Sequence, residues 1–161
     1  MANFTAVFDA CVLYPAPLRD LLLSVVTTKQ LQRTVALMNQ AVPDCLVENY
    51  EILIDALTLP DPNDRHVLAA AIKCQADVIV TNNLKDFPNA IVGHYDIDVQ
   101  TPDVFLSHLY DLNPAMFFSA VRQQRERLAN PAYTAEELLD VFYNQGLPLT
   151  VGKLGEVVDL L

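Results

Sequence analysis

Three aspartates are the residues of this sequence whose type and position could do chemistry. Asp9 directly follows an apolar run at residues 4–8, and Asp86 comes shortly after a second apolar run at residues 77–81. Asp64 opens an alanine-rich segment between them. Carboxylates that converge repel one another unless a cation or protons offset the charge. Oxygen ligands suit Mg²⁺ and Mn²⁺, so the sequence predicts a divalent-metal site.

Asp64 also has a purely structural interpretation. Asp61 followed by Pro62 is typical of a helix N-cap and first helical position. Asp64 would then be an acid of the first turn, where the helix dipole favours negative charge. The spacing alone leaves both roles open.

The loop that contains Asp86 offers two polar neighbours that could support it. Asn83 could hold the loop through its side-chain amide. Thr81 is either a site residue or the last β-branched residue of a strand. Asp86 itself fits an ordinary solvated turn as well as a ligand position.

The segments that must position these residues alternate between strands and helices. Apolar runs predict strands at residues 4–8, 45–50, 77–81 and 97–99. Helical spacing and caps predict helices at residues 18–26, 29–41, 51–57, 62–72 and 103–110. This alternation indicates a three-layer α/β fold with a mostly parallel central sheet. Functional groups of such sheets gather beyond the carboxyl ends of the strands, where Asp9 and Asp86 are expected.

The character of the sequence changes after residue 113. Asn113-Pro114 predicts a helix start, with the helix running to about residue 129, and Thr134 with Glu137 forms a capping box for a helix ending near Gly146. A last helix is predicted at residues 150–160. We therefore expect one domain at residues 1–113 and a helical C-terminal extension at residues 114–161.

Composition restricts the class of protein. No apolar run reaches the roughly 18 residues that a membrane span needs, and the N-terminus lacks the features of a signal peptide. A cytoplasmic protein without a membrane partner is expected. The three cysteines lack metal-ligand spacing, which argues against a zinc site. The net charge of −10 is unusual for a protein that binds nucleic acid, although a metal held by acids can meet a phosphate.

Three segments resemble the PIN-domain family, and within it the VapC-like toxins of prokaryotic toxin–antitoxin pairs. They are FDACVLYPAPLRDLL at residues 8–22, LPDPNDRHVLAAAI at 59–72 and VIVTNNLKDFP at 78–88. The resemblance covers residues 4–110. The tail at residues 130–151 is similar to the C-terminal extension of a PIN subgroup.

The resemblance implies an endoribonuclease that depends on Mg²⁺ or Mn²⁺. Its partners would be an RNA substrate, an antitoxin protein and a second copy of the chain. Asp9 would be the first metal-binding acid, Asp64 the acid at the start of the central helix, and Asp86 the acid on the opposite side of the site. All three would bind the metal and be catalytic. Thr81 and Asn83 would assist Asp86.

The sequence departs from the family pattern at two points. Many relatives have asparagine two positions after the first aspartate, where this chain has Cys11. Relatives also carry a glutamate on a helix between the first and central acids, but residues 21–38 contain no acid. This segment is shorter than in relatives, as if a helical piece were missing near residues 25–28. Glu48 and Glu51 lie after it, and we do not expect either to replace the glutamate.

These departures leave two functions open. The first is a metal-dependent endoribonuclease that acts as the toxin of a toxin–antitoxin pair. The second is a catalytically impaired PIN scaffold that binds protein or RNA, which the missing glutamate and the acidic charge favour.

Overall fold

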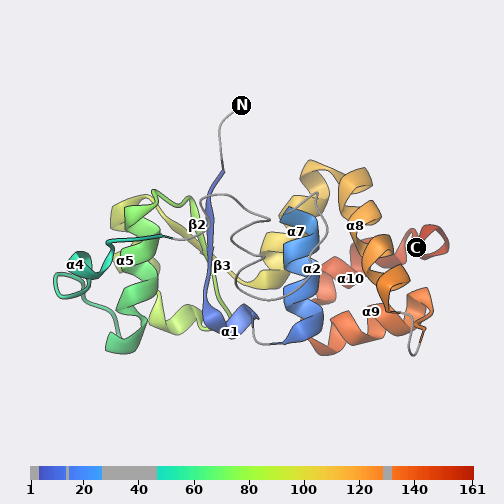
Figure 1. Cartoon of the computed structure of the whole chain (residues 1–161), viewed down its shortest axis with the longest axis horizontal. Coiled ribbons are helices and arrows are strands. Elements are labelled where there is room, and N and C mark those ends of the chain that lie inside the picture. The colour runs from blue at the N-terminus through green and yellow to red at the C-terminus, as the bar shows by residue number, and fades with distance from the viewer. Residues whose placement is uncertain (1–3, 14, 27–46, 129–131) are drawn as a thin grey trace. The chain divides into compact units, whose positions relative to one another are not determined.

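The computed structural model describes residues 4–13, 15–26, 47–128 and 132–161 of the 161-residue chain (Figure 1). These residues form two compact units. The first unit contains residues 4–13 and 47–101, and the second contains residues 15–26, 102–128 and 132–161. The strands lie in the first unit, and the second unit is helical.

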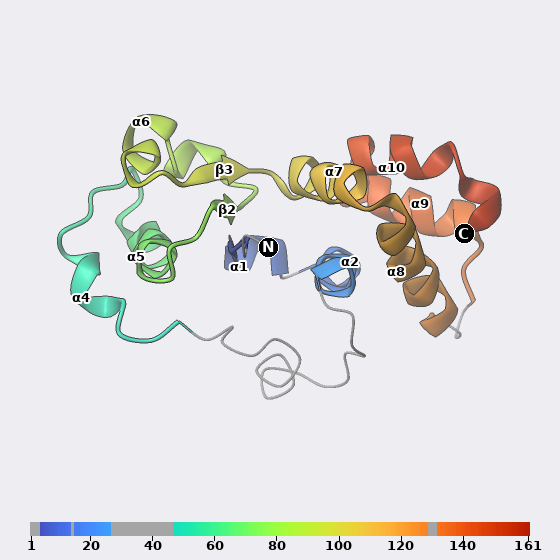
Figure 2. The same ribbon diagram turned by 90° about the horizontal axis from the view of Figure 1, so that it is seen from above.

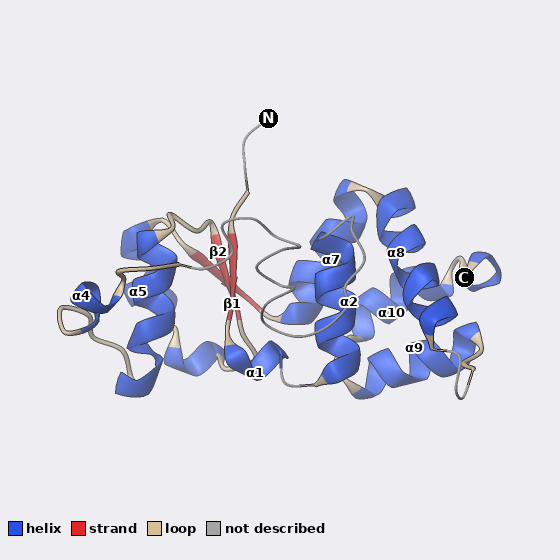
Figure 3. Ribbon diagram, viewed as in Figure 1, coloured by secondary structure: helices blue, strands red, loops and turns tan. Residues whose placement is uncertain are grey.

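Among the described residues, three parallel strands form the sheet of the first unit (Figure 3). Their order is β1 (Ala6–Phe8), β2 (Val78–Val80) and β3 (Asp98–Gln100), and Val80 pairs with both Phe8 and Gln100. Every residue of β2 is buried, which suits a strand that has neighbours on both sides. The carboxyl ends of the strands therefore lie at one edge of the sheet, directly before Asp9 and Thr81.

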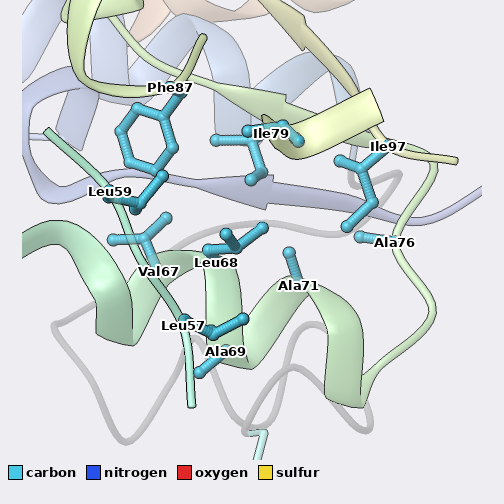
Figure 4. Close-up of a cluster of buried hydrophobic side chains, with 11 residues drawn as sticks. Leu57, Leu59, Val67, Leu68, Ala69, Ala71, Ala76, Ile79, Phe87 and Ile97 are labelled. Atoms are coloured by element: carbon cyan, nitrogen blue, oxygen red, sulfur yellow. The ribbon is translucent and has the colours of Figure 1, made fainter. Parts of the chain in front are cut away.

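Helix α5 (Arg65–Lys73) packs against β1 and β2. Its buried residues are Val67, Leu68, Ala69 and Ala71, and the alanines favour the helix while taking little space. Figure 4 shows Leu68 and Ala71 beside Ile79 of the central strand, within a core that also includes Phe87 and Ile97. This core fixes the start of α5, where Asp64 lies, relative to the sheet.

Short helical segments complete the first unit. They are α1 (Ala10–Leu13), α4 (Glu51–Ile54), α6 (Asn89–Val92) and the 3₁₀ turns η1 (Pro62–Asp64), η2 (Leu84–Asp86) and η3 (Gly93–Tyr95). As predicted, Asp61 caps the segment that precedes α5: its Oδ1 accepts a hydrogen bond from the Asn63 amide at 2.8 Å, and Pro62 takes the first position.

The second unit contains α2 (Ala16–Val26), α7 (Pro102–Leu112), α8 (Pro114–Arg127), α9 (Ala135–Asn144), α10 (Pro148–Gly155) and the turn η4 (Val158–Leu160). Helix α2 packs against α7, α8 and α9, and α10 packs against α7 and α9 (Figure 2). The predicted capping box is present, because Thr134 and Glu137 exchange hydrogen bonds at the start of α9. Gly146 adopts a φ of 81° after that helix, a conformation that glycine tolerates best.

Helices α7 and α10 are joined by a buried carboxylate. Asp103 is 6% exposed and accepts hydrogen bonds from the Leu149 amide, the Thr150 amide and the Thr150 hydroxyl, each at 2.9 Å. It therefore caps α10 from a neighbouring helix. Further along α7, the Lys153 ammonium donates to the Ser107 carbonyl in the middle of the helix at 3.1 Å and to Asp111 near its end at 2.5 Å.

The α/β fold, the parallel sheet and the C-terminal helices are confirmed, and the three-layer arrangement stays a prediction. The strand predicted at residues 45–50 is wrong for its described part, residues 47–50, where Asn49 has a φ of 59° that a strand cannot continue through. The helix predicted at residues 29–41 and the junction after residue 26 lie outside the described residues. No helix in the described ranges is long and apolar enough to cross a membrane.

The two compact units differ from the two segments predicted from composition. The sequence changes character at Asn113, which caps α8 by accepting a hydrogen bond from the Met116 amide at 3.0 Å. In the structure α7 packs with α8 and α10, so the second unit already begins at Pro102 and also includes α2.

Candidate metal centre

Asp9 lies at the carboxyl edge of the sheet, as the sequence predicted. Its amide donates to the Val80 carbonyl at 3.0 Å, which continues the pairing of β1 with β2 by one residue. The side chain is largely buried, at 8% exposure. Thr81, the residue after β2, is fully buried, and its hydroxyl donates to Asp9 Oδ2 at 2.8 Å. The structure therefore brings these two predicted residues into direct contact.

Cys11 contacts the same carboxylate oxygen. Its thiol donates to Asp9 Oδ2 at 3.0 Å, and its sulfur also accepts from the Asn82 amide at 3.5 Å. Burial raises the pKa of Cys11, and Asp9 raises it further, whereas hydrogen bonds from Thr81 and Asn82 lower it. Because the net direction is upward, Cys11 carries the proton that it donates at neutral pH.

Three further carboxylates gather in the same unit. One oxygen from each of Asp61, Asp64 and Asp86 lies within 4.8 Å of the other two. Asp86 is the last residue of η2, and it accepts a hydrogen bond from the Asn83 side-chain amide. The structure thus brings Asp64 and Asp86 together and places Asn83 as the support of Asp86. We call Asp61, Asp64 and Asp86 the aspartate triad.

Asp9 lies outside the triad, but its charge acts on Asp64. Burial raises the pKa of Asp64, and the negative charges of Asp9, Asp61 and Asp86 raise it further, while His66 lowers it. The ionised state of Asp64 is therefore the unfavourable one, because three other carboxylates repel its charge. A divalent cation would convert this repulsion into attraction.

The donor set of the triad fits a hard cation. Every ligand atom that it offers is a carboxylate oxygen, the type that Mg²⁺ and Mn²⁺ prefer. Asp64 Oδ2 is buried and makes no hydrogen bond within the described part of the chain. Buried polar atoms are nearly always satisfied, so this carboxylate oxygen fits the role of a ligand to a bound cation.

Asp61 is the triad residue that sequence reasoning missed, because its capping role appeared sufficient. The signal that could have found it is the three-residue spacing of Asp61 and Asp64 around Pro62. Asp61 is the N-cap of the 3₁₀ turn that ends at Asp64, and its carbonyl accepts a hydrogen bond from the Asp64 amide at 3.2 Å, so this single tight turn keeps the two acids close together.

The expected glutamate has no counterpart at the described part of this centre. The triad consists of aspartates, and Glu48 and Glu51 are exposed, with Glu51 at the start of α4. Most of the stretch between α2 and α4 lies outside the described residues.

Comparisons with known proteins support the resemblance found in the sequence. Residues 16–85 match the PIN domain family, and residues 102–156 match the VapC50 C-terminal domain family. The chain is 39% identical over 82 residues to a Mycobacterium tuberculosis protein named as a candidate ribonuclease, VapC50. That match covers 51% of this chain and 48% of the relative, so the chain spans about half the length of the curated relative.

No solved structure gives a significant match to the chain. The two family matches follow one another along the chain, from α2 to the end of α10, and neither includes residues 86–101. The predicted resemblance to the PIN-domain family, and within it to VapC-like proteins, is thereby confirmed.

Proposed function

We propose that this chain is a Mg²⁺- or Mn²⁺-dependent endoribonuclease and the toxin of a toxin–antitoxin pair. The observation that carries the proposal is the aspartate triad with an unpartnered buried oxygen on Asp64, beside the buried Asp9. The match to the PIN domain and the likeness to a protein named as a ribonuclease support RNA as the substrate.

The residues of the centre have two roles: some would bind the cation, and others orient the residues that bind it. Asp9, Asp64 and Asp86, with Asp61, would hold the cation. Thr81 orients Asp9 and Asn83 orients Asp86 through the hydrogen bonds already described. A divalent cation bound there would lower the pKa of a water molecule that serves as the nucleophile, and it would stabilise the negative charge that develops on the phosphate.

Replacement of Asp9 by asparagine tests this assignment. We expect the wild-type chain to cleave a labelled RNA in the presence of Mg²⁺ or Mn²⁺. We expect cleavage to stop when EDTA removes the metal. Asp9→Asn removes one negative charge from the centre, and we expect the cleavage rate to fall at least about tenfold, the lower limit for residues that support a metal site. Asp55→Asn is the control, because Asp55 is an exposed acid after α4 in the same unit.

Equal cleavage by wild type and Asp9→Asn would contradict the assignment of Asp9. Metal binding without RNA cleavage by the wild type would instead favour the alternative function, a catalytically impaired PIN scaffold that binds protein or RNA.

An acidic protein that cleaves RNA needs cations where the substrate lies. Arg65 and Lys85 directly adjoin Asp64 and Asp86 in the chain. Within the described residues neither forms an ion pair, and Arg65 Nε is buried without a hydrogen-bond partner. We propose that both contact RNA phosphates on either side of the triad.

The salt dependence of RNA binding measures these contacts. Each phosphate contact on single-stranded RNA contributes about 0.7 to the slope of log affinity against log salt concentration. In an Asp9→Asn background, which limits cleavage, we expect Arg65→Gln and Lys85→Gln each to lower this slope by about 0.7. Fluorescence anisotropy of a labelled RNA over a KCl series provides the measurement.

Lys73→Gln is the matched control for these variants. Lys73 is an exposed cation of the same unit, at the opposite end of α5 from Arg65. The helix separates the two by about 12 Å, at 1.5 Å per residue. If all three variants change the slope equally, net charge explains the binding and the two proposed contacts are wrong.

The family resemblance also supports two protein partners, an antitoxin and a second copy of this chain, and we propose a cytoplasmic location. Size-exclusion chromatography with light scattering tests the dimer.

A further inference from the structure

The two oxygens of the Asp9 carboxylate have different surroundings. Oδ2 accepts two side-chain hydrogen bonds, from the Thr81 hydroxyl at 2.8 Å and from the Cys11 thiol at 3.0 Å. No hydrogen bond to Oδ1 is present within the described residues. Among the residues that the structure describes, the hydrogen-bond donors of the protein therefore gather on one of the two oxygens, Oδ2.

The Cys11 thiol is itself held in place. The Asn82 amide donates to its sulfur at 3.5 Å, and the sulfur lies 3.5 Å from the Thr81 hydroxyl oxygen. That hydroxyl also accepts from the Asn83 amide at 3.0 Å. The backbone amides of Asn82 and Asn83 therefore hold the Cys11 thiol and the Thr81 hydroxyl in place. These two side chains in turn hold Oδ2 of Asp9.

We propose that Cys11 is a positioning residue that acts through Asp9, holding Oδ2 so that Oδ1 faces a divalent cation. The proposal rests on the proposed metal-dependent function. Residues that orient a metal ligand by hydrogen bonding set the rotamer and the basicity of that ligand. The thiol is a weak donor, so Thr81 supplies the stronger hydrogen bond to Oδ2. The second hydrogen bond, from Cys11, further restricts rotation of the Asp9 carboxylate.

This arrangement explains how the chain tolerates the departure noted in its sequence. The family pattern has asparagine at this position, a residue with an amide donor. Cysteine supplies a single donor of smaller size, and in this chain the donor reaches the Asp9 carboxylate because α1 begins directly after Asp9.

Mn²⁺ affinity measured by isothermal titration calorimetry tests the proposal. We expect Cys11→Ala to weaken Mn²⁺ binding by about tenfold, the lower end of the effect of residues that support a metal ligand. Cys11→Ser retains a donor and should restore most of the affinity. Cys74→Ala is the control, since Cys74 is a half-buried thiol of the same unit whose sulfur donates to the Ala71 carbonyl at 3.6 Å.

A double-mutant cycle separates positioning from general structural damage. If Cys11 acts through Asp9, Cys11→Ala has little further effect on Mn²⁺ affinity once Asp9 is asparagine, whereas independent effects add.

Three results would overturn the proposal: additive losses in the double variant, equal losses in Cys11→Ala and Cys74→Ala, or full Mn²⁺ affinity in Cys11→Ala. If Asp9→Asn leaves no measurable Mn²⁺ binding, the two Cys11 variants test the proposal instead. Higher Mn²⁺ affinity in Cys11→Ser than in Cys11→Ala supports it, and equal affinity overturns it. A wild-type chain that binds no Mn²⁺ overturns the proposed metal-dependent function, and with it this inference.

Discussion

Asparagine in place of Asp64 is expected to lower RNA cleavage more than about a hundredfold, beyond the loss typical of residues that only support a metal ligand. The same change is expected to raise the thermal stability of the metal-free protein. Asp64 is the triad member whose ionised form is disfavoured by burial and by the charges of Asp9, Asp61 and Asp86. Removing its charge removes that repulsion and also removes a ligand. Opposite signs for activity and stability distinguish a functional site from a structural one.

The pH dependence of stability follows from the direction of the pKa shift. The pKa of Asp64 is higher in the folded chain than in the unfolded chain, so the folded state binds more protons between the two values. Stability of the metal-free protein therefore falls as pH rises through this interval, and the loss is complete above the folded pKa. Asp64→Asn should abolish this contribution.

Thermal melting in EDTA measures both effects. A rise of about 2–4 °C in Tm corresponds to about 1 kcal/mol for a chain of this size. Addition of Mn²⁺ should raise the Tm of the wild type but not that of Asp64→Asn, because a ligand stabilises only the state that binds it. A lower Tm for the metal-free variant would mean that Asp64 stabilises the fold, as its position in the first turn before α5 would allow.

Alanine in place of Asp103 is expected to have the largest effect on stability, about 3 kcal/mol in the free energy of unfolding. Asp103 is buried and accepts three hydrogen bonds from the first turn of α10. Truncation leaves those donors without a partner in the interior, which costs more than the hydrogen bonds themselves contribute. Urea denaturation followed by circular dichroism gives the free energy.

Asp111→Ala is the matched control for Asp103→Ala. Asp111 is also on α7 and also binds α10, through Lys153, but its side chain is 61% exposed. An exposed ion pair contributes less than about 1 kcal/mol because water screens it. Equal losses from the two variants would show that Asp103 does not cap α10 in solution.

The sequence predicted the carboxyl edge of the sheet because apolar strands end abruptly in polar residues. Asp9 and Thr81 follow β1 and β2, and parallel pairing places those ends side by side. Asn83 and Asp86 were found for a similar reason, since the loop after β2 is short and polar. Position along the chain and strand direction placed these residues at one edge of the sheet, whereas the site roles of Thr81, Asn83 and Asp86 came from the family resemblance.

Other features depend on local backbone geometry that periodicity does not encode. The 3₁₀ turn at η1 adds Asp61 to the triad, although a capping role explained that residue fully. Asn49 interrupts the apolar run at residues 45–50 with a left-handed conformation. The limits of the second unit follow from the packing of α7, which a change of composition at Asn113 could not indicate.

Calorimetric titration of Mn²⁺ tests the central claim, that these aspartates hold a divalent cation. The wild-type chain is expected to bind Mn²⁺, and Asp9→Asn, Asp61→Asn, Asp64→Asn and Asp86→Asn are each expected to bind it at least about tenfold more weakly. Asp55→Asn should match the wild type. Wild-type affinity in all four centre variants, or an equal loss in Asp55→Asn, would contradict a metal site formed by these residues.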